Sequence, residues 1–122
     1  MVIKMSAPVK RILTELTKLE GVKGAVIVSK DGMLVDAVVP VKEFDPEDLA
    51  ASVTQAVVNL QKIGAAFNLG DPKILSQEYE NGMLVVGDLG DNFVLVIADR
   101  TAMVGMIRNE IKKLRDKLKA LV

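Results

Sequence analysis

The chain contains neither histidine nor cysteine, and these absences remove much of the chemistry of enzyme sites. They exclude thiolate nucleophiles, imidazole general bases and the usual zinc ligands. They also exclude disulfide bonds, which fits a reducing compartment such as the cytoplasm. Only carboxylates, lysines, hydroxyls and one tyrosine remain for catalysis. We therefore expect a protein that is not an enzyme.

Aromatic residues are scarce and no charge predominates. The aromatic residues are Phe44, Phe67, Tyr79 and Phe93, and 16 lysines and arginines balance 16 aspartates and glutamates. A nucleic-acid-binding protein usually carries a basic excess and aromatic rings on which bases stack. The composition therefore indicates no nucleic-acid partner.

Long apolar runs and phosphate-binding loops are also missing. Nowhere do 18 apolar residues follow one another, so we expect no membrane insertion and a cytoplasmic location. Neither G-x-x-x-x-G-K-[ST] nor a G-x-G-x-x-G after a strand occurs, so we expect no nucleotide and no other cofactor. Because histidine and cysteine ligands are missing, we also expect no bound metal. A length of 122 residues predicts a single domain over residues 1–122.

The pattern of apolar residues and turn signals predicts an α/β (α+β) fold. Asp31-Gly32 and Asn81-Gly82 are hairpin signals, and Ser6 is a possible cap of the first helix. Thr101 or Asp99 is expected to cap the last helix. The predicted order is a helix (7–20), two strands (25–29 and 34–39), a helix (45–68), three strands (74–80, 83–86 and 93–98) and a final helix. The arrangement expected is a five-stranded antiparallel sheet with helices on both faces, with strand 93–98 at its centre because it is apolar on both faces.

The segment 45–68 is predicted to be a helix of about six turns with very few charges. Asp45 can cap its first turn, where Pro46 is well tolerated, and Asp48 resembles the second half of a capping box. One apolar stripe is expected to cover the core: Leu49, Val53, Ala56, Leu60, Ile63 and Phe67. The other side is small and weakly polar: Ala51, Thr54, Gln55, Val58, Asn59, Lys62 and Ala65.

A helix side with so few charges is expected to be covered. The last helix, in contrast, carries eight charged residues beside its apolar stripe, as a solvated helix does. Burial of the middle helix inside its own subunit is the less favoured alternative, because a chain of this length seldom forms a third layer. We expect another chain to cover it. Strand 74–80 alternates polar and apolar residues and is expected at a sheet edge.

Several short motifs in this order resemble the Roadblock family, named for dynein light chains. They are Gly21-Val22-Lys23-Gly24-Ala25-Val26-Ile27-Val28 with Asp31-Gly32, then Gly82-Met83-Leu84-Val85-Val86, Val94-Leu95-Val96-Ile97-Ala98, and Gly105 with Ile107-Arg108-Asn109-Glu110-Ile111. The resemblance covers about residues 9–119. It implies a homodimer or heterodimer in which the third strands pair and the two long helices lie together on one face of a continuous sheet.

Bacterial and archaeal members of that family often partner Ras-like GTPases, and one gliding-motility member activates its GTPase. The resemblance therefore implies a non-enzymatic dimeric regulator or adaptor of a Ras-like small GTPase. Such a regulator can act as a GTPase-activating protein by reshaping the GTPase's own catalytic groups. The residues expected to bind a protein partner lie on the outer side of the long helix: Ala51, Gln55, Val58, Asn59, Lys62 and Ala66. The residues expected at the dimer edge strand are Leu75, Gln77 and Tyr79.

Other functions stay open at this point. The alternative is a structural dimerisation or scaffold module of a motor or membrane-associated assembly, with no effect on GTP hydrolysis. A small-molecule sensor is a third class, disfavoured because the predicted strand interiors are uniformly apolar.

Individual polar residues have plainer explanations. Asp88 and Asp91 could form a carboxylate pair but suit a turn, and Asp31 likewise suits its hairpin turn. Arg100 and Arg108 could serve a GTPase but are expected to be solvated. Methionines 33, 83, 103 and 106 could line a partner groove but are expected mainly to fill the core.

Overall fold

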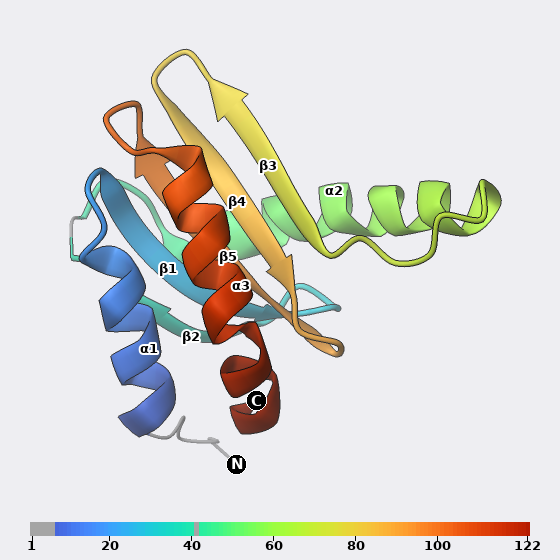
Figure 1. Cartoon of the computed structure of the whole chain (residues 1–122), viewed down its shortest axis with the longest axis horizontal. Coiled ribbons are helices and arrows are strands. Elements are labelled where there is room, and N and C mark those ends of the chain that lie inside the picture. The colour runs from blue at the N-terminus through green and yellow to red at the C-terminus, as the bar shows by residue number, and fades with distance from the viewer. Residues whose placement is uncertain (1–6, 41) are drawn as a thin grey trace.

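The predicted order of elements is confirmed by the computed structural model, which describes residues 7–40 and 42–122 (Figure 1). All strand pairs are antiparallel, in the sheet order β2-β1-β5-β4-β3. The elements are α1 (Ala7–Thr17), β1 (Val22–Ser29), β2 (Leu34–Val38), α2 (Pro46–Ala66), β3 (Ile74–Tyr79), β4 (Gly82–Asp88), β5 (Asn92–Asp99) and α3 (Val104–Leu121).

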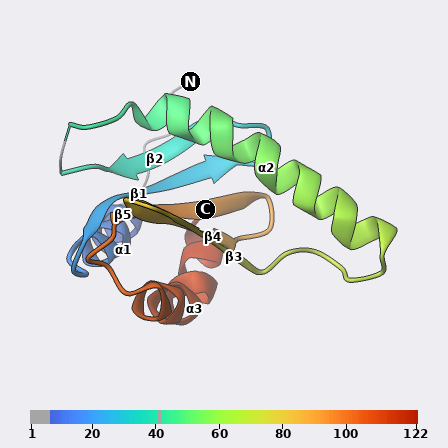
Figure 2. The same cartoon turned by 90° about the horizontal axis from the view of Figure 1, so that it is seen from above.

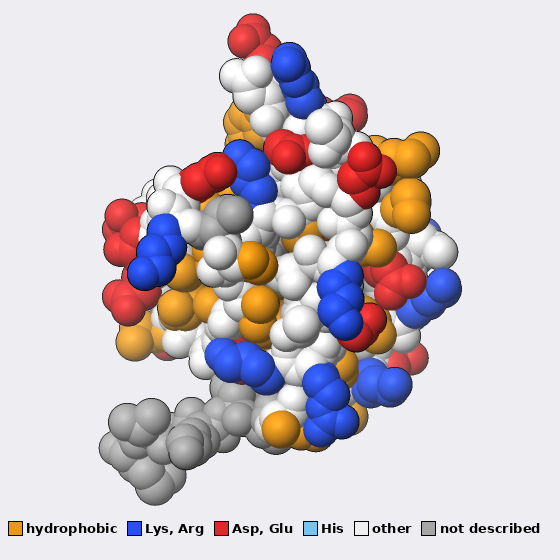
Figure 3. Space-filling view, turned by 90° about the vertical axis from the view of Figure 1, so that its left-hand side faces the viewer, with side chains coloured by type: hydrophobic (Ala, Val, Ile, Leu, Met, Phe, Trp, Pro, Cys, Tyr) orange, Lys and Arg blue, Asp and Glu red, His pale blue; other side chains and the backbone are white. Residues whose placement is uncertain are grey.

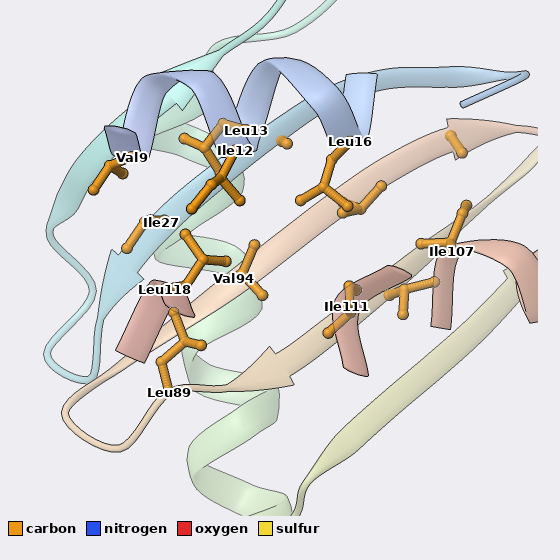
Figure 4. Close-up of a cluster of buried hydrophobic side chains, with 14 of the residues drawn as sticks. Val9, Ile12, Leu13, Leu16, Ile27, Leu89, Val94, Ile107, Ile111 and Leu118 are labelled. Carbon is orange, nitrogen blue, oxygen red and sulfur yellow. The ribbon is translucent and has the colours of Figure 1, made fainter. Parts of the chain in front are cut away.

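Helices cover both faces of the sheet, as expected. Figure 2 shows α2 on one face and α1 with α3 on the other. The α1 and α3 side holds the larger core, where Leu13, Ile111 and Leu118 are fully buried with Val94 of β5 (Figure 4). On the α2 side, Phe93 and Leu95 of β5 are buried in a second, smaller core. Because β5 is apolar on both faces, it occupies the centre of the sheet.

The start of α2 follows the predicted cap. Asp45 has extended backbone angles, and its Oδ1 accepts a hydrogen bond from the Glu47 N–H at 2.9 Å. Pro46 occupies the first turn, where its missing N–H costs nothing.

Removal of this cap should measurably destabilise the protein. Asp45→Ala is expected to lower the free energy of unfolding by about 1 kcal/mol, because one first-turn N–H loses its partner. For a chain of this size the melting temperature should fall by about 4 °C, measurable by thermal unfolding followed by circular dichroism. Asp45→Asn is the matched control, since asparagine caps equally well. Equal melting temperatures of Asp45→Ala and the native protein would contradict this assignment.

Only part of α2 lies on the sheet of its own subunit. Its buried residues in this region, Ala50, Val53 and Val57, pack with β-strand residues of the smaller core. Figures 1 and 2 show the C-terminal half of α2 extending beyond the edge strand β3. We call this half, residues 58–66, the overhang of α2.

The apolar stripe predicted for the core of this subunit is therefore only partly correct. Val53 is buried and Leu49 and Leu60 are half-buried, but the other three stripe residues are exposed: Ala56, Ile63 and Phe67. The reason is geometric, because α2 leaves the sheet before its last turns. Thr54, predicted on the outer side, is also misplaced: it is buried, and its hydroxyl donates to the Ala50 carbonyl at 2.7 Å.

Some predicted element ends were wrong. The first helix ends at Thr17, three residues early, because the chain turns at Gly21 with a φ of +83°. The last helix begins after Met103, which makes no side-chain cap; Asp99 instead accepts a hydrogen bond from the Thr101 N–H at 2.8 Å within the preceding turn. The predicted cap Ser6 lies outside the described residues.

Candidate functional site

An open groove runs between α2 and the edge of the sheet. Its volume is about 540 Å³. The helix contributes Leu49, Ser52, Val53, Ala56, Asn59 and Leu60, and the sheet contributes Leu75, Gln77, Tyr79, Leu84 and Val86. We call this the α2 groove. Most of its side chains are apolar, so contact with water is unfavourable and a covering partner would stabilise it.

The groove continues toward the start of α2. The continuation, lined in part by Phe44, Leu84 and Ile97, has a volume of about 660 Å³. Lys23 and Glu43 form an ion pair there, with Nζ and Oε2 2.6 Å apart. The hydrogen bond that Lys23 donates to Glu43 holds the pKa of the Lys23 ammonium above its usual value. This part of the groove therefore combines charged side chains with apolar ones.

The predicted edge-strand residues line this groove. β3 has β4 as its only neighbour in the described sheet, so its other side is open. Leu75 is half-buried, whereas Gln77 and Tyr79 are exposed, Tyr79 to 61%. An open strand edge with an exposed aromatic ring is a ready site for strand addition.

The six residues predicted to bind a partner form a separate surface. All lie on α2; Ala51, Gln55, Asn59, Lys62 and Ala66 are exposed and Val58 is half-buried. Of these only Asn59 lines the α2 groove. We call the other five (Ala51, Gln55, Val58, Lys62 and Ala66) the outer side of α2. Lys62 carries its one charge.

An apolar tip lies at the end of the overhang and just beyond it, and the prediction had assigned two of its residues, Ile63 and Phe67, to the core. Ile63 and Phe67 are 48% and 71% exposed, and Leu69 in the following loop is 74% exposed. The loop folds back over the helix, because the Leu69 N–H donates to the Gly64 carbonyl at 2.8 Å. Ala56 lines the α2 groove and Ile63 is exposed near the end of the helix, whereas their apolar spacing had placed both in the core of the subunit.

The carboxylates considered for chemistry have structural roles. Asp88 pairs with Lys30 and accepts the Gly90 N–H at 3.2 Å, so it organises the loop between β4 and β5. Asp31 accepts a hydrogen bond from Ser29, and this bond lowers the pKa of the Asp31 carboxyl. Asp91 is exposed in the same loop as Gly90. These contacts support the interpretation as turn residues.

Two expectations for other residues were wrong. Arg108 is not simply solvated, because its Nη1 donates to the Ser76 Oγ of β3 at 2.7 Å. Of the four methionines, only Met83 fills the core; Met33, Met103 and Met106 are exposed. Arg100, the other arginine considered for a GTPase, is exposed as predicted.

Charge on the visible surface is mixed in sign. The face in Figure 3 intersperses basic and acidic side chains with small apolar areas. Among the helices of residues 7–40 and 42–122, none combines the length and hydrophobicity needed to cross a bilayer.

Comparison with known families agrees with this geometry. The model of the Roadblock/LC7 domain matches residues 8–99 of the chain. The chain belongs to the Roadblock/LC7 family. Its curated relatives include the uncharacterized protein MJ0310 of Methanocaldococcus jannaschii, which is 31% identical over 113 residues, covering 93% of this chain and 98% of the relative.

Solved structures of the Roadblock/LC7 kind share the fold. MglB of Myxococcus xanthus superposes with a TM-score of 0.87 at 21% identity, and the match covers 96% of each chain. The gliding protein MglB of Thermus thermophilus gives a TM-score of 0.87 at 17% identity, covering 98% of this chain and 94% of that one. At these identities the likeness establishes the fold alone.

Proposed function

We propose that this Roadblock/LC7 protein is a homodimer that regulates a Ras-like small GTPase in the cytoplasm. A second copy covers the α2 groove and the open edge of β3, and the paired α2 helices offer their outer sides to the GTPase. The observation that carries this proposal is the overhang of α2, which leaves the sheet of its own subunit with apolar residues exposed.

A second copy suits the uncovered surface. The overhang has no sheet beneath it, and on the α2 face the sheet near β3 has no helix over it. If a two-fold axis lies near β3, the overhang of one subunit lies over the sheet of its partner. Both uncovered surfaces are then buried. Small side chains such as Ser52 and Ala56 on the groove side of α2 allow two helices to approach closely.

The outer side of α2 remains free in such a dimer and suits a protein partner. Apart from Lys62 its exposed residues are small or weakly polar, so little desolvation opposes a contact at these positions. Two outer sides related by symmetry form one rigid surface, and a rigid surface is what positioning a GTPase's own water and arginine requires.

The protein is not proposed to supply catalytic groups. Arg108 of α3 is hydrogen-bonded to Ser76, and α3 lies on the sheet face opposite α2. A GTPase bound to the outer side of α2 would therefore be out of its reach. Activation would rest on positioning groups that belong to the GTPase.

The proposed function is tested by mixing the purified protein with a Ras-like GTPase of the same organism. Phosphate release from bound GTP should rise at least tenfold over the GTPase alone. Binding without faster release would indicate the adaptor role. Absence of binding to every Ras-like GTPase of the organism, measured by interferometry, would overturn the proposal.

A further inference from the structure

The hydrogen-bonding pattern between β3 and β4 determines which backbone N–H and carbonyl groups of β3 point to its open edge. The Asp88 N–H donates to the Lys73 carbonyl at 2.9 Å, and these two residues extend by one pair the β3–β4 register that begins at Ile74 and Gly87. In an antiparallel pair the bonded residues alternate along a strand. Leu75, Gln77 and Tyr79 therefore bond to β4, whereas Ile74, Ser76 and Glu78 direct their N–H and carbonyl groups outward.

Opposite charges lie near this edge on the α3 face. Arg108 donates to Ser76, and Glu78 is the next residue of β3 on the same face. Among the described residues, neither Arg108 nor Glu78 takes part in an intrasubunit ion pair. Each side chain is thus available to a neighbouring chain across the edge.

We propose that β3 pairs with β3 of a second copy in an antiparallel register centred on Gln77, with Arg108 of each subunit binding Glu78 of the other. This inference rests on the proposed dimer and specifies its register. Because the two-fold axis keeps α2 on the same face in both subunits, two residues that lie opposite each other must point to the same face. Their sequence numbers then differ by an even number, since side chains alternate between faces along a strand. The pairing is therefore centred on one residue, which lies opposite its own copy.

The register centred on Gln77 matches the chemistry on both faces. On the α3 face, Ser76 lies opposite Glu78 of the partner subunit at a Cα separation of about 5.5 Å, the spacing of a hydrogen-bonded pair. Arg108, held at Ser76, then reaches that carboxylate. On the α2 face, Leu75 lies opposite Tyr79 of the partner subunit, a favourable aliphatic–aromatic pair.

Neighbouring registers are chemically worse. Centring on Ser76 places Glu78 opposite Ile74 of the partner subunit and brings two Arg108 guanidinium groups to the same point. Centring on Glu78 places two carboxylates directly opposite each other. Like charges at opposite positions destabilise strand pairing. Charge complementarity therefore selects Gln77 as the central residue.

Single cysteines report the register directly, because the native chain has none. Gln77 would lie opposite its own copy as a non-hydrogen-bonded pair, with a Cα separation of about 4.5 Å, which a disulfide spans. Gln77→Cys should form a dimeric band on a non-reducing gel after mild oxidation, and Ser76→Cys and Glu78→Cys should form little. A mixture of these last two variants should cross-link with each other.

The outcomes separate the register from the dimer. Preferential cross-linking of Ser76→Cys or of Glu78→Cys with itself would overturn the register while supporting the dimer. A dimeric mass with no cross-link at Gln77→Cys would also overturn it. A monomeric mass at all concentrations would overturn both proposals.

A charge exchange tests the ion pair. Glu78→Arg and Arg108→Glu should each weaken the homodimer about tenfold, since two attractive pairs become repulsive. Mixed together, the two variants should form a heterodimer about as tight as the native dimer, because each Arg–Glu contact is restored. The mixture controls for any damage from losing the Arg108–Ser76 bond. Failure of the mixture to associate better than either variant alone would overturn the ion pair.

Discussion

Ala56→Glu is expected to convert the protein to a monomer. Ala56 is exposed in the subunit and lines the α2 groove, so the substitution disturbs no packing within the subunit. In the proposed dimer the new carboxylate is desolvated beside its symmetry copy. We expect the dissociation constant of the dimer to rise at least hundredfold, or about 3 kcal/mol, in sedimentation equilibrium.

Ala51→Glu is the matched control for this experiment. It places the same charge on the same helix, but five residues away and therefore about 140° around the helix axis. Ala51 is exposed and does not line the α2 groove. The dimer should persist in this variant, and the helix content of both variants should equal that of the native protein. Dimerisation of Ala56→Glu with native affinity would remove α2 from the interface.

Val58→Glu is expected to weaken binding of the proposed GTPase partner at least tenfold while keeping the dimer. Val58 is half-buried at the centre of the outer side of α2 and does not line the groove. A carboxylate there would have to be desolvated against the GTPase, so the affinity should fall at least tenfold in titration calorimetry.

A threonine at the same position separates charge from shape. Val58→Thr keeps the branched side chain and adds no charge, so it should bind the GTPase nearly as the native protein does. The light-scattering mass and the melting temperature of both variants identify any loss of fold or dimer. Native affinity of Val58→Glu for the GTPase would place the binding surface elsewhere.

Local rules predicted the elements of this fold well. Asp45 and Pro46 marked the start of α2, and the apolar run at 93–98 identified the central strand, because capping and burial act within a few residues. The edge position of β3 was predicted because Ser76, Glu78 and Glu80 place polar side chains on one side of the strand. These features depend little on the rest of the chain.

Tertiary placement was harder to predict. The stripe containing Ala56, Ile63 and Phe67 was assigned to the core of this subunit, since periodicity gives the face of a helix but not the length of sheet beneath it. The Arg108–Ser76 bond joins elements 32 residues apart and has no local signal. The candidate site therefore depends on the placement of α2 relative to β3, which local sequence patterns do not give.

The central claim is that a second copy covers the α2 groove and the edge of β3. Multi-angle light scattering of the native protein at micromolar concentration tests it most directly. We predict a mass of twice the 13.2 kDa of a single chain. A mass of 13.2 kDa at every concentration measured, with the protein folded, would contradict the account.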